Sequence, residues 1–192
     1  MELLQAFTAA RRSGVPIVAV RTADQWAAVQ EIGTLKDVEG FAQLRWDAAR
    51  GLTAINKPGE VAIQAAKIKL ENTLGFADAM VSIDTLKARG AVVYAHNAMR
   101  QLVSQEPGAT APAVQAVSNL RDTFKQDFRT LVLLGASCPS VSELDQDLVV
   151  LDHALPSEAV LREVVIDICE AALKASKAFK MPSKETLERA TD

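Results

Sequence analysis

Two histidines are the side chains of this chain best suited to acid–base or metal chemistry. His96 and His153 are the only histidines, and each follows a short apolar segment of the kind that forms a β-strand. An imidazole in such a place could act as a general base or bind a metal ion. A metal site needs three or four converging ligands, and no third ligand has a recognisable spacing. The sequence therefore favours histidines that are hydrogen-bonded to a neighbouring carbonyl or to water.

The pair Ser137-Cys138 could hold a nucleophile. It does not stand in the Gly-x-Ser-x-Gly pattern, and Pro139 indicates a turn, so we expect Cys138 to be a buried thiol. Acidic residues occupy every second position at Glu143, Asp145 and Asp147, as in a cation-binding loop. The segment lacks the glycine and the distal glutamate of such a loop. The sequence thus predicts no catalytic residue, no cofactor-binding residue and no metal ligand in this chain.

Apolar strands and amphipathic helices alternate along the chain, and they must position these groups. Strands are predicted at 15–20, 41–47, 90–97, 130–136 and 148–151. Helices are predicted at 2–12, from 22, at 78–89, 98–103 and 113–126, from 140, and at 156–178. Residues 60–74 fit a helix or a strand, and the helix is favoured. Strands that are apolar throughout are typical of a parallel sheet covered on both faces. We therefore expect a three-layer α/β/α domain with a mainly parallel sheet of about five strands, and segment 41–47, which alternates, at an edge of that sheet.

Polar side chains follow several of the predicted strands, where ligands of open α/β sheets bind. Arg21, Asp47, Arg50 and His96 are the predicted contacts of this rim with a partner or ligand. Arginine pairs well with anions. Asn97, Ser137 and His153 complete the set of strand-end residues.

A phosphate-binding loop is missing where a nucleotide-binding sheet would carry it. Such a loop needs Gly-x-x-x-x-Gly-Lys-Ser/Thr between the first strand and its helix. Here the junction reads Arg21-Thr22-Ala23-Asp24, and the capping-box spacing Thr22-x-x-Gln25 predicts that the helix begins at once. The turn 56–59 contains a lysine and a glycine, but Pro58 removes an amide. The central strand ends in Ala95-His96-Asn97 and not in the acidic residues that would hold Mg²⁺.

Composition narrows the function classes. The 192 residues are 49% hydrophobic and carry a formal net charge of −3, with charges of both signs spread along the chain, so nucleic acid is not expected as an obligatory partner. Only two cysteines are present and no apolar stretch approaches the roughly 20 residues of a membrane span. We expect a cytoplasmic protein that does not enter the membrane. The predicted organisation is one domain over residues 1–180, followed at 181–192 by the start of a linker.

Several segments, in order and spacing, resemble the N-terminal domain of a family of AAA-type ATPases that algal chloroplast genomes encode and that has bacterial and phage relatives. They are Val15–Val20, Leu44–Leu52, Gly90–Asn97, Arg129–Leu134 and Val149–Glu158, the last with the sequence Leu-Pro-Ser-Glu at its end. The resemblance implies an ATPase-like domain that has lost its phosphate loop and precedes a true AAA+ module. Residues 183–192 resemble the connection to that module. One departure is Ala95-His96, where the family often has a charged residue.

The resemblance implies that this chain is a non-catalytic domain with an assembly, regulatory or partner-binding role. ATP and Mg²⁺ would bind to the AAA+ module of the parent protein, and this chain itself would hold no cofactor. Its expected partners are that module, further copies assembled through it, and an unidentified protein. Two alternatives remain open at this point: a stand-alone domain that binds a small molecule or anion at the rim, and an oligomerisation module without any ligand.

Overall fold

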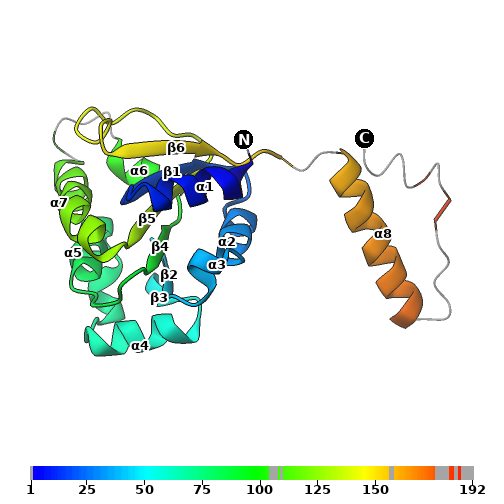
Figure 1. Cartoon of the computed structure of the whole chain (residues 1–192), viewed down its shortest axis with the longest axis horizontal. Helices are drawn as coiled ribbons and strands as arrows, with labels where there is room; N and C mark the ends of the chain where they lie inside the picture. Colours follow the sequence, from blue (N-terminus) through cyan, green and yellow to red (C-terminus); the bar gives the residue numbers. More distant parts are fainter. Residues whose placement is uncertain are drawn as a thin grey trace. The chain divides into compact units, whose positions relative to one another are not determined.

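The computed structural model describes residues 2–103, 108, 110–155, 158–175, 182, 183 and 186 (Figure 1). The chain divides into two compact units, Met1–His153 and Ala154–Asp192. The turn residues Pro107, Gly108 and Pro112 predict a loop at 105–112, and half of that segment lies outside the described residues, as does most of the predicted linker at 181–192. The predicted domain boundary at residue 180 stays a prediction.

A six-stranded sheet forms the centre of the first unit, with the strand order β3-β2-β4-β5-β1-β6. The strands are β1 (Ile17–Arg21), β2 (Gln43–Asp47), β3 (Gly51–Ala54), β4 (Val92–Ala95), β5 (Thr130–Gly135) and β6 (Leu148–Asp152). All neighbouring pairs are parallel except β2 and β3. The α/β class and the mainly parallel sheet are confirmed. The strand number of about five is corrected to six, because Gly51, at a φ of +69°, reverses the chain and lets β3 cover the edge that was predicted for 41–47.

Helices lie on both faces of this sheet, as a three-layer domain requires (Figure 1). One face packs Ile17, Trp46 and Leu133 against α4 (Lys57–Ala65), α5 (Phe76–Asp84), α6 (Met99–Leu102) and α7 (Ala111–Asp127). The opposite face packs Val18 and Tyr94 against α1 (Leu3–Arg12), α2 (Gln25–Gly33) and α3 (Lys36–Glu39). Successive strand residues point to opposite faces, which is why the strand sequences are apolar throughout.

The helix after β1 begins two residues later than the capping-box prediction. Asp24 is its N-cap, and the Asp24 Oδ1 accepts a hydrogen bond from the backbone N–H of Ala27 at 2.9 Å. The helical period predicts Trp26, Val29 and Ile32 on the buried face. The observed buried face includes Ala28, Val29 and Ile32, whereas Trp26 is 47% exposed. The prediction of a Thr22 cap was therefore wrong by two positions. Trp26 instead lies beneath the Arg45 guanidinium, 5.6 Å from its carbon to the ring centre.

Two other local predictions are corrected. The turn 56–59 is the N-terminus of α4: Asn56 Oδ1 accepts hydrogen bonds from the backbone N–H groups of Gly59 and Gln43, both at 3.0 Å. Residues 142–147 form consecutive turns and not the predicted helix. A serine and a glutamate at capping spacing do not suffice there, because too few residues follow before β6 begins at Leu148.

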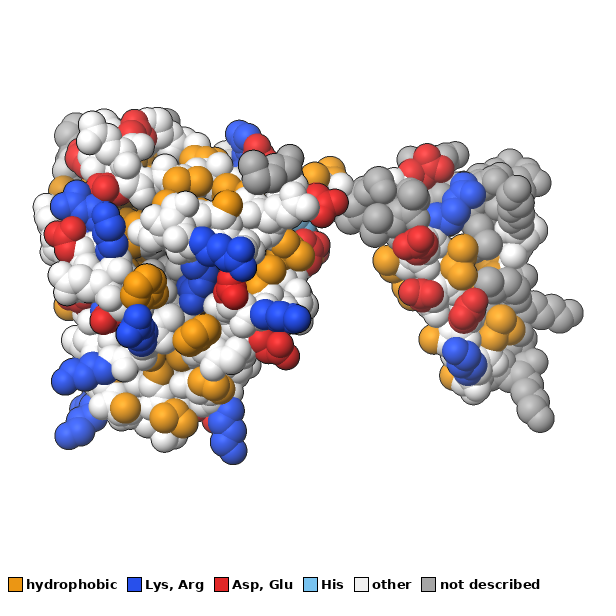
Figure 2. Space-filling model, in the orientation of Figure 1, with side chains coloured by type: hydrophobic (Ala, Val, Ile, Leu, Met, Phe, Trp, Pro, Cys, Tyr) orange, Lys and Arg blue, Asp and Glu red, His pale blue; other side chains and the backbone are white. Residues whose placement is uncertain are grey.

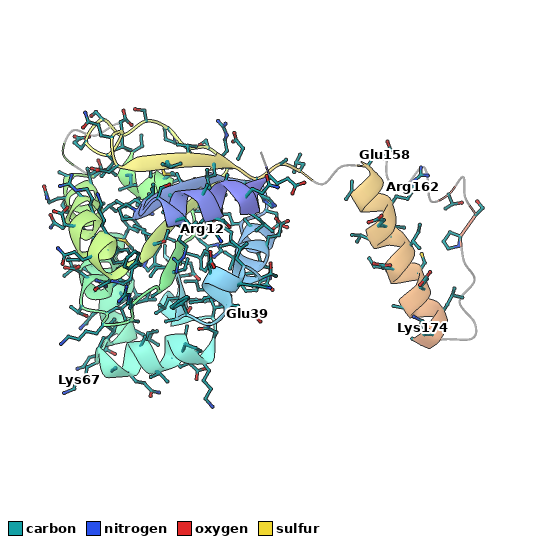
Figure 3. All side chains as sticks on the ribbon, in the orientation of Figure 1. Arg12, Glu39, Lys67, Glu158, Arg162 and Lys174 are labelled. Atoms are coloured by element: carbon teal, nitrogen blue, oxygen red, sulfur yellow. The ribbon has the colours of Figure 1, made fainter. Side chains whose placement is uncertain are left out.

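The second unit contains α8 (Glu158–Ala175). Glu158 and Arg162 lie one turn apart on it, with 3.5 Å between their charged groups (Figure 3). The helical period predicts a buried apolar face on this helix, with Leu161, Val164 and Ile168 among its residues, but these three side chains are exposed in the described structure. Figure 2 shows apolar side chains on the surface of this helix. The helical period identifies an apolar face but not the surface that covers it. None of the described helices is long and apolar enough to cross a membrane.

Candidate site at the carboxyl edge of the sheet

The parallel strands bring the predicted rim residues to one edge of the sheet. Along this edge the order is Asp47 on β2, His96 after β4, the end of β5, and then Arg21 on β1. Neighbouring strands lie about 4.8 Å apart. Arg21 and Asp47, three strands apart, are therefore separated by roughly 14 Å along the rim. The prediction of a shared edge holds, but the structure does not bring Arg21 together with the other three candidates.

A direct hydrogen-bonded bridge links α2 to the end of β4. The Gln25 side-chain Nε2 donates to Asn97 Oδ1 at 2.8 Å, and the Asn97 backbone N–H donates to Gln25 Oε1 at 2.9 Å. Asn97 has a φ of +53°, a left-handed conformation that asparagine tolerates better than most residues. Protein atoms thus join the start of the first helix to the end of the central strand.

The connection between β1 and α2 is short, and two of its three backbone N–H groups are hydrogen-bonded. It consists of Thr22, Ala23 and Asp24. The Thr22 backbone N–H donates to Gly135 O at 2.8 Å, and the Asp24 backbone N–H donates to Thr22 Oγ1 at 3.1 Å. The Asp24 carboxylate occupies the N-terminus of the helix. The backbone N–H groups of Thr22 and Asp24 are therefore already engaged and could not hydrogen-bond to a phosphate.

Arg21 and Asp152 form an ion pair at the β1–β6 end of the rim. Their Nε and Oδ1 atoms lie 2.6 Å apart, and both side chains are more than half exposed. The hydrogen bond raises the pKa of Arg21 and lowers the pKa of Asp152. Next to them, His153 Nδ1 lies 2.7 Å from Thr22 Oγ1 and its Nε2 lies 3.3 Å from Glu31 Oε1. Arg21 already has an anionic partner. The His153 ring is hydrogen-bonded, but to a hydroxyl and a carboxylate and not to the carbonyl or water that the sequence led us to expect.

His96 is placed differently from His153. Its Nε2 is buried and lacks a hydrogen-bond partner among the described residues. Burial lowers the pKa of His96, the nearby Arg45 lowers it further, and Asp47 acts in the opposite direction. Asp47 Oδ1 accepts hydrogen bonds from the backbone N–H groups of Ala49 and Arg50 at 3.0 and 2.8 Å. Asp47 therefore shapes the turn into β3, and Arg50 is exposed on that turn.

A cavity of about 280 Å³ lies beside the ends of β4 and β5. Arg100 is the charged residue in its lining, which also includes Asn97, Met99, Val103, Gly135, Ala136, Ser137 and Pro139. Arg100 is not recognisable as a site residue from the sequence, because a lone arginine in a predicted helix carries no spacing signal. Cys138 is half-buried, and burial raises the pKa of its thiol, which makes it a poor nucleophile at neutral pH. No group of three metal-binding side chains gathers anywhere in the described part of the chain.

Residues 3–153 match the family model described as "SpoVK-like AAA ATPase, N-terminal domain". The chain belongs to this family. The predicted resemblance to the N-terminal domain of an AAA-type ATPase is thereby confirmed. The match ends at the last residue of the first compact unit. A comparison with curated proteins gives no matching sequence.

Two solved structures similar to this SpoVK-like domain differ widely from it in sequence. A DNA replication initiation factor aligns with a TM-score of 0.50 at 10% identity over 96% of this chain and 53% of that protein's chain. A chain of the E. coli MS115-1 HORMA:CdnC:Trip13 complex aligns with a TM-score of 0.49 at 10% identity over 97% and 61%. The first likeness shows an AAA+-like fold and nothing of function. The chain spans about half to three-fifths of the length of these two chains.

Proposed function

We propose that this SpoVK-like N-terminal domain is a non-hydrolysing part of its ATPase, with an assembly, regulatory or partner-binding role. ATP and Mg²⁺ would bind to a separate AAA+ module of the parent protein and not to this sheet. The observation that carries the proposal is the three-residue connection between β1 and α2, which has no room for a phosphate loop and ends in the Asp24 cap; the Gln25–Asn97 bridge adds to it by joining the start of α2 to the end of β4.

The first support concerns the phosphate. In a P-loop protein, glycines let successive backbone N–H groups surround the phosphates, and a lysine neutralises them. The connection here has neither glycine nor lysine, and a carboxylate, that of Asp24, caps the helix that follows it. A phosphate approaching this helix would meet a negative charge and would have to displace a cap worth about 1 kcal/mol.

The second support concerns the metal. Mg²⁺ in such sites is held by an acidic residue at the end of a strand and by the P-loop hydroxyl. Strand β4 ends in Ala95 and continues into His96 and Asn97. Neither side chain is a carboxylate, and the Asn97 amide is engaged by Gln25. The edge therefore offers no strong magnesium ligand at this strand end.

Isothermal titration with MgATP tests the proposal. Titration of this chain into the millimolar range of MgATP is expected to give no saturable heat. The variant Gln25→Ala opens the bridge, and it is also expected not to bind, because the cradle itself is missing. Saturable micromolar binding by the wild-type chain would overturn the proposal. Binding by Gln25→Ala alone would show that the bridge, and not the missing loop, excludes nucleotide.

The anion-binding alternative has weaker support from the geometry. Arg21 is paired with Asp152, and it lies roughly 14 Å along the rim from Asp47. Arg50 is exposed on a turn at the far end of the same edge. A small anion could not contact all of these groups at once. The rim residues Arg21, Asp47, Arg50 and His96 stay predicted partner contacts, spread over a surface and not gathered in one pocket.

A further inference from the structure

The strand β6 forms an open edge of the sheet (Figure 1). It pairs with β1 on one side, and the backbone N–H of His153 donates to Arg21 O at 3.0 Å. Because backbone groups along a strand alternate in direction, Val149 and Leu151 also face β1. Val150 and Asp152 then direct their N–H and C=O groups away from the sheet.

These outward groups have no partner among the described residues. The N–H of Leu148 is satisfied by Leu144 O at 2.9 Å. The N–H groups of Val150 and Asp152 donate to no backbone or side-chain oxygen of the described residues, and the Val150 side chain is 47% exposed. An edge of this kind is a template for another strand. It carries no lysine, proline or bulge, which are the usual protections of a free edge.

The opposite edge of the sheet is protected. There the outward N–H of Leu52 on β3 donates to Thr73 Oγ1 at 2.9 Å. Thr73 belongs to the 3₁₀ helix η1 (Leu70–Thr73), which covers this strand. The fold therefore closes one edge with a dedicated element and leaves the apolar edge β6 uncovered in its described part.

We infer that β6 pairs antiparallel with β6 of a second copy, which joins the two sheets across a two-fold axis at Val150. In this arrangement, free N–H and C=O groups of one β6 strand pair with free groups of the other copy's β6. Val150 would exchange two hydrogen bonds with Val150 of the second copy, and each Asp152 N–H would donate to the free Leu148 C=O of the other copy. The Leu148 N–H stays bonded to Leu144 O, so the outward C=O of each Asp152 receives no donor from the other copy.

The side chains fit the same arrangement. The two-fold axis places Val150 opposite its own copy, and pairs of β-branched residues stabilise neighbouring strands. Asp152 lies at the end of the strand, so antiparallel pairing keeps the two Asp152 carboxylates at opposite ends of the interface. Each remains beside its own Arg21. This inference rests on the proposed assembly role. Titration with MgATP tests the proposed function, and sedimentation tests the β6 pairing, so a failure of one can be told from a failure of the other.

Sedimentation equilibrium of the whole chain, with two edge variants, tests the inference. The wild-type mass is expected to rise with concentration from 20.6 kDa toward twice that value. Val150→Pro removes one outward N–H and leaves the β1 ladder intact, since proline is tolerated on the free side of an edge strand. Val150→Lys places a charge at the centre of the interface without altering the backbone. Both variants are expected to stay at the monomer mass while retaining the wild-type circular dichroism spectrum.

A matched control separates the edge from the exposed apolar face of α8. Ile168→Lys makes the same kind of change at a side chain that is 62% exposed on α8, and it is expected to leave the dimer unchanged. Hydrogen exchange of the Val150 and Asp152 amides is expected to slow with rising protein concentration. A wild-type chain that stays monomeric would overturn the inference. A dimer that persists in Val150→Lys, or that Ile168→Lys abolishes, would overturn it equally.

Discussion

The Thr73 hydroxyl accepts the hydrogen bond of an outward N–H group on the edge strand β3. Removing this hydroxyl tests how much that bond stabilises the fold. The Thr73 Oγ1 accepts from the buried Leu52 N–H at 2.9 Å and donates to Leu70 O at 2.8 Å. Thr73 itself is fully buried. Valine has nearly the same shape, so Thr73→Val removes both hydrogen bonds without leaving a large cavity.

The magnitude follows from these contacts. Leaving the buried Leu52 N–H without an acceptor lowers the free energy of unfolding by about 1–3 kcal/mol, and loss of the bond to Leu70 O lowers it by about 1 kcal/mol more. The added methyl group returns at most about 0.8 kcal/mol. We expect Thr73→Val to lower the free energy of unfolding by about 2 kcal/mol.

Urea denaturation followed by circular dichroism measures this change. Thr85→Val is the matched control, because the Thr85 hydroxyl makes the same kind of bond, to Ser82 O at 2.7 Å, but on an exposed helix end. It should cost less than about 0.5 kcal/mol. If the two variants lost the same stability, the Thr73 hydroxyl would not be what satisfies the edge, and the contrast between the two sheet edges would fail.

Two further predictions concern buried cationic groups. Burial lowers the pKa of His96 below its ordinary value of 6.5, so the unfolded chain binds the proton more tightly and the wild type loses stability as the pH falls below about 6.5. His96→Asn should lose less over the same range, and equal losses in urea midpoint at about pH 7.5 and about pH 5.5 would contradict this. Arg129→Met should cost about 2–3 kcal/mol, because the buried Arg129 donates to Ile83 O at 3.0 Å. Arg121→Met, on the exposed side of α7, should cost less than about 1 kcal/mol by the same urea assay, and a comparable cost would count against the burial argument.

The sequence predicted the layers of this fold well, because strand sequences that are apolar throughout leave few alternatives to a covered parallel sheet. It missed β3, a strand of four residues whose hydrophobic content is one leucine, Leu52. The reversal that creates β3 depends on the left-handed Gly51 and on the distant Thr73, and the latter contact has no local signal. Helical spacing from Arg121 predicts that Arg129 is a solvent-facing cation, yet Arg129 is 3% exposed. The chain direction after α7 changes at Phe128, which has a φ of +57°, so helical spacing could not place the next residue.

The rim was predictable in kind but not in arrangement. Parallel strands ensure that their carboxyl ends share an edge, and the strand-end residues are identifiable from the sequence. Strand order decides which of them meet, and β1 is inserted between β5 and β6. This order pairs Arg21 with Asp152, a residue 131 positions away. The partnership between Gln25 and Asn97 depends on the same order and spans 72 positions.

The carboxyl ends of the strands and the side edge formed by β6 differ in how easily a partner could bind to them. At the carboxyl edge, two pairs of polar side chains are engaged with each other, Gln25 with Asn97 and Arg21 with Asp152. A ligand that binds at either pair would first have to break these bonds. Along β6, by contrast, the outward N–H groups of Val150 and Asp152 have no protein partner among the described residues. A second strand could hydrogen-bond to these groups and bury Val150 without breaking any bond that the described residues make to them. Of the two edges, β6 therefore requires the smaller rearrangement for a partner to bind, which is why we place the assembly contact there.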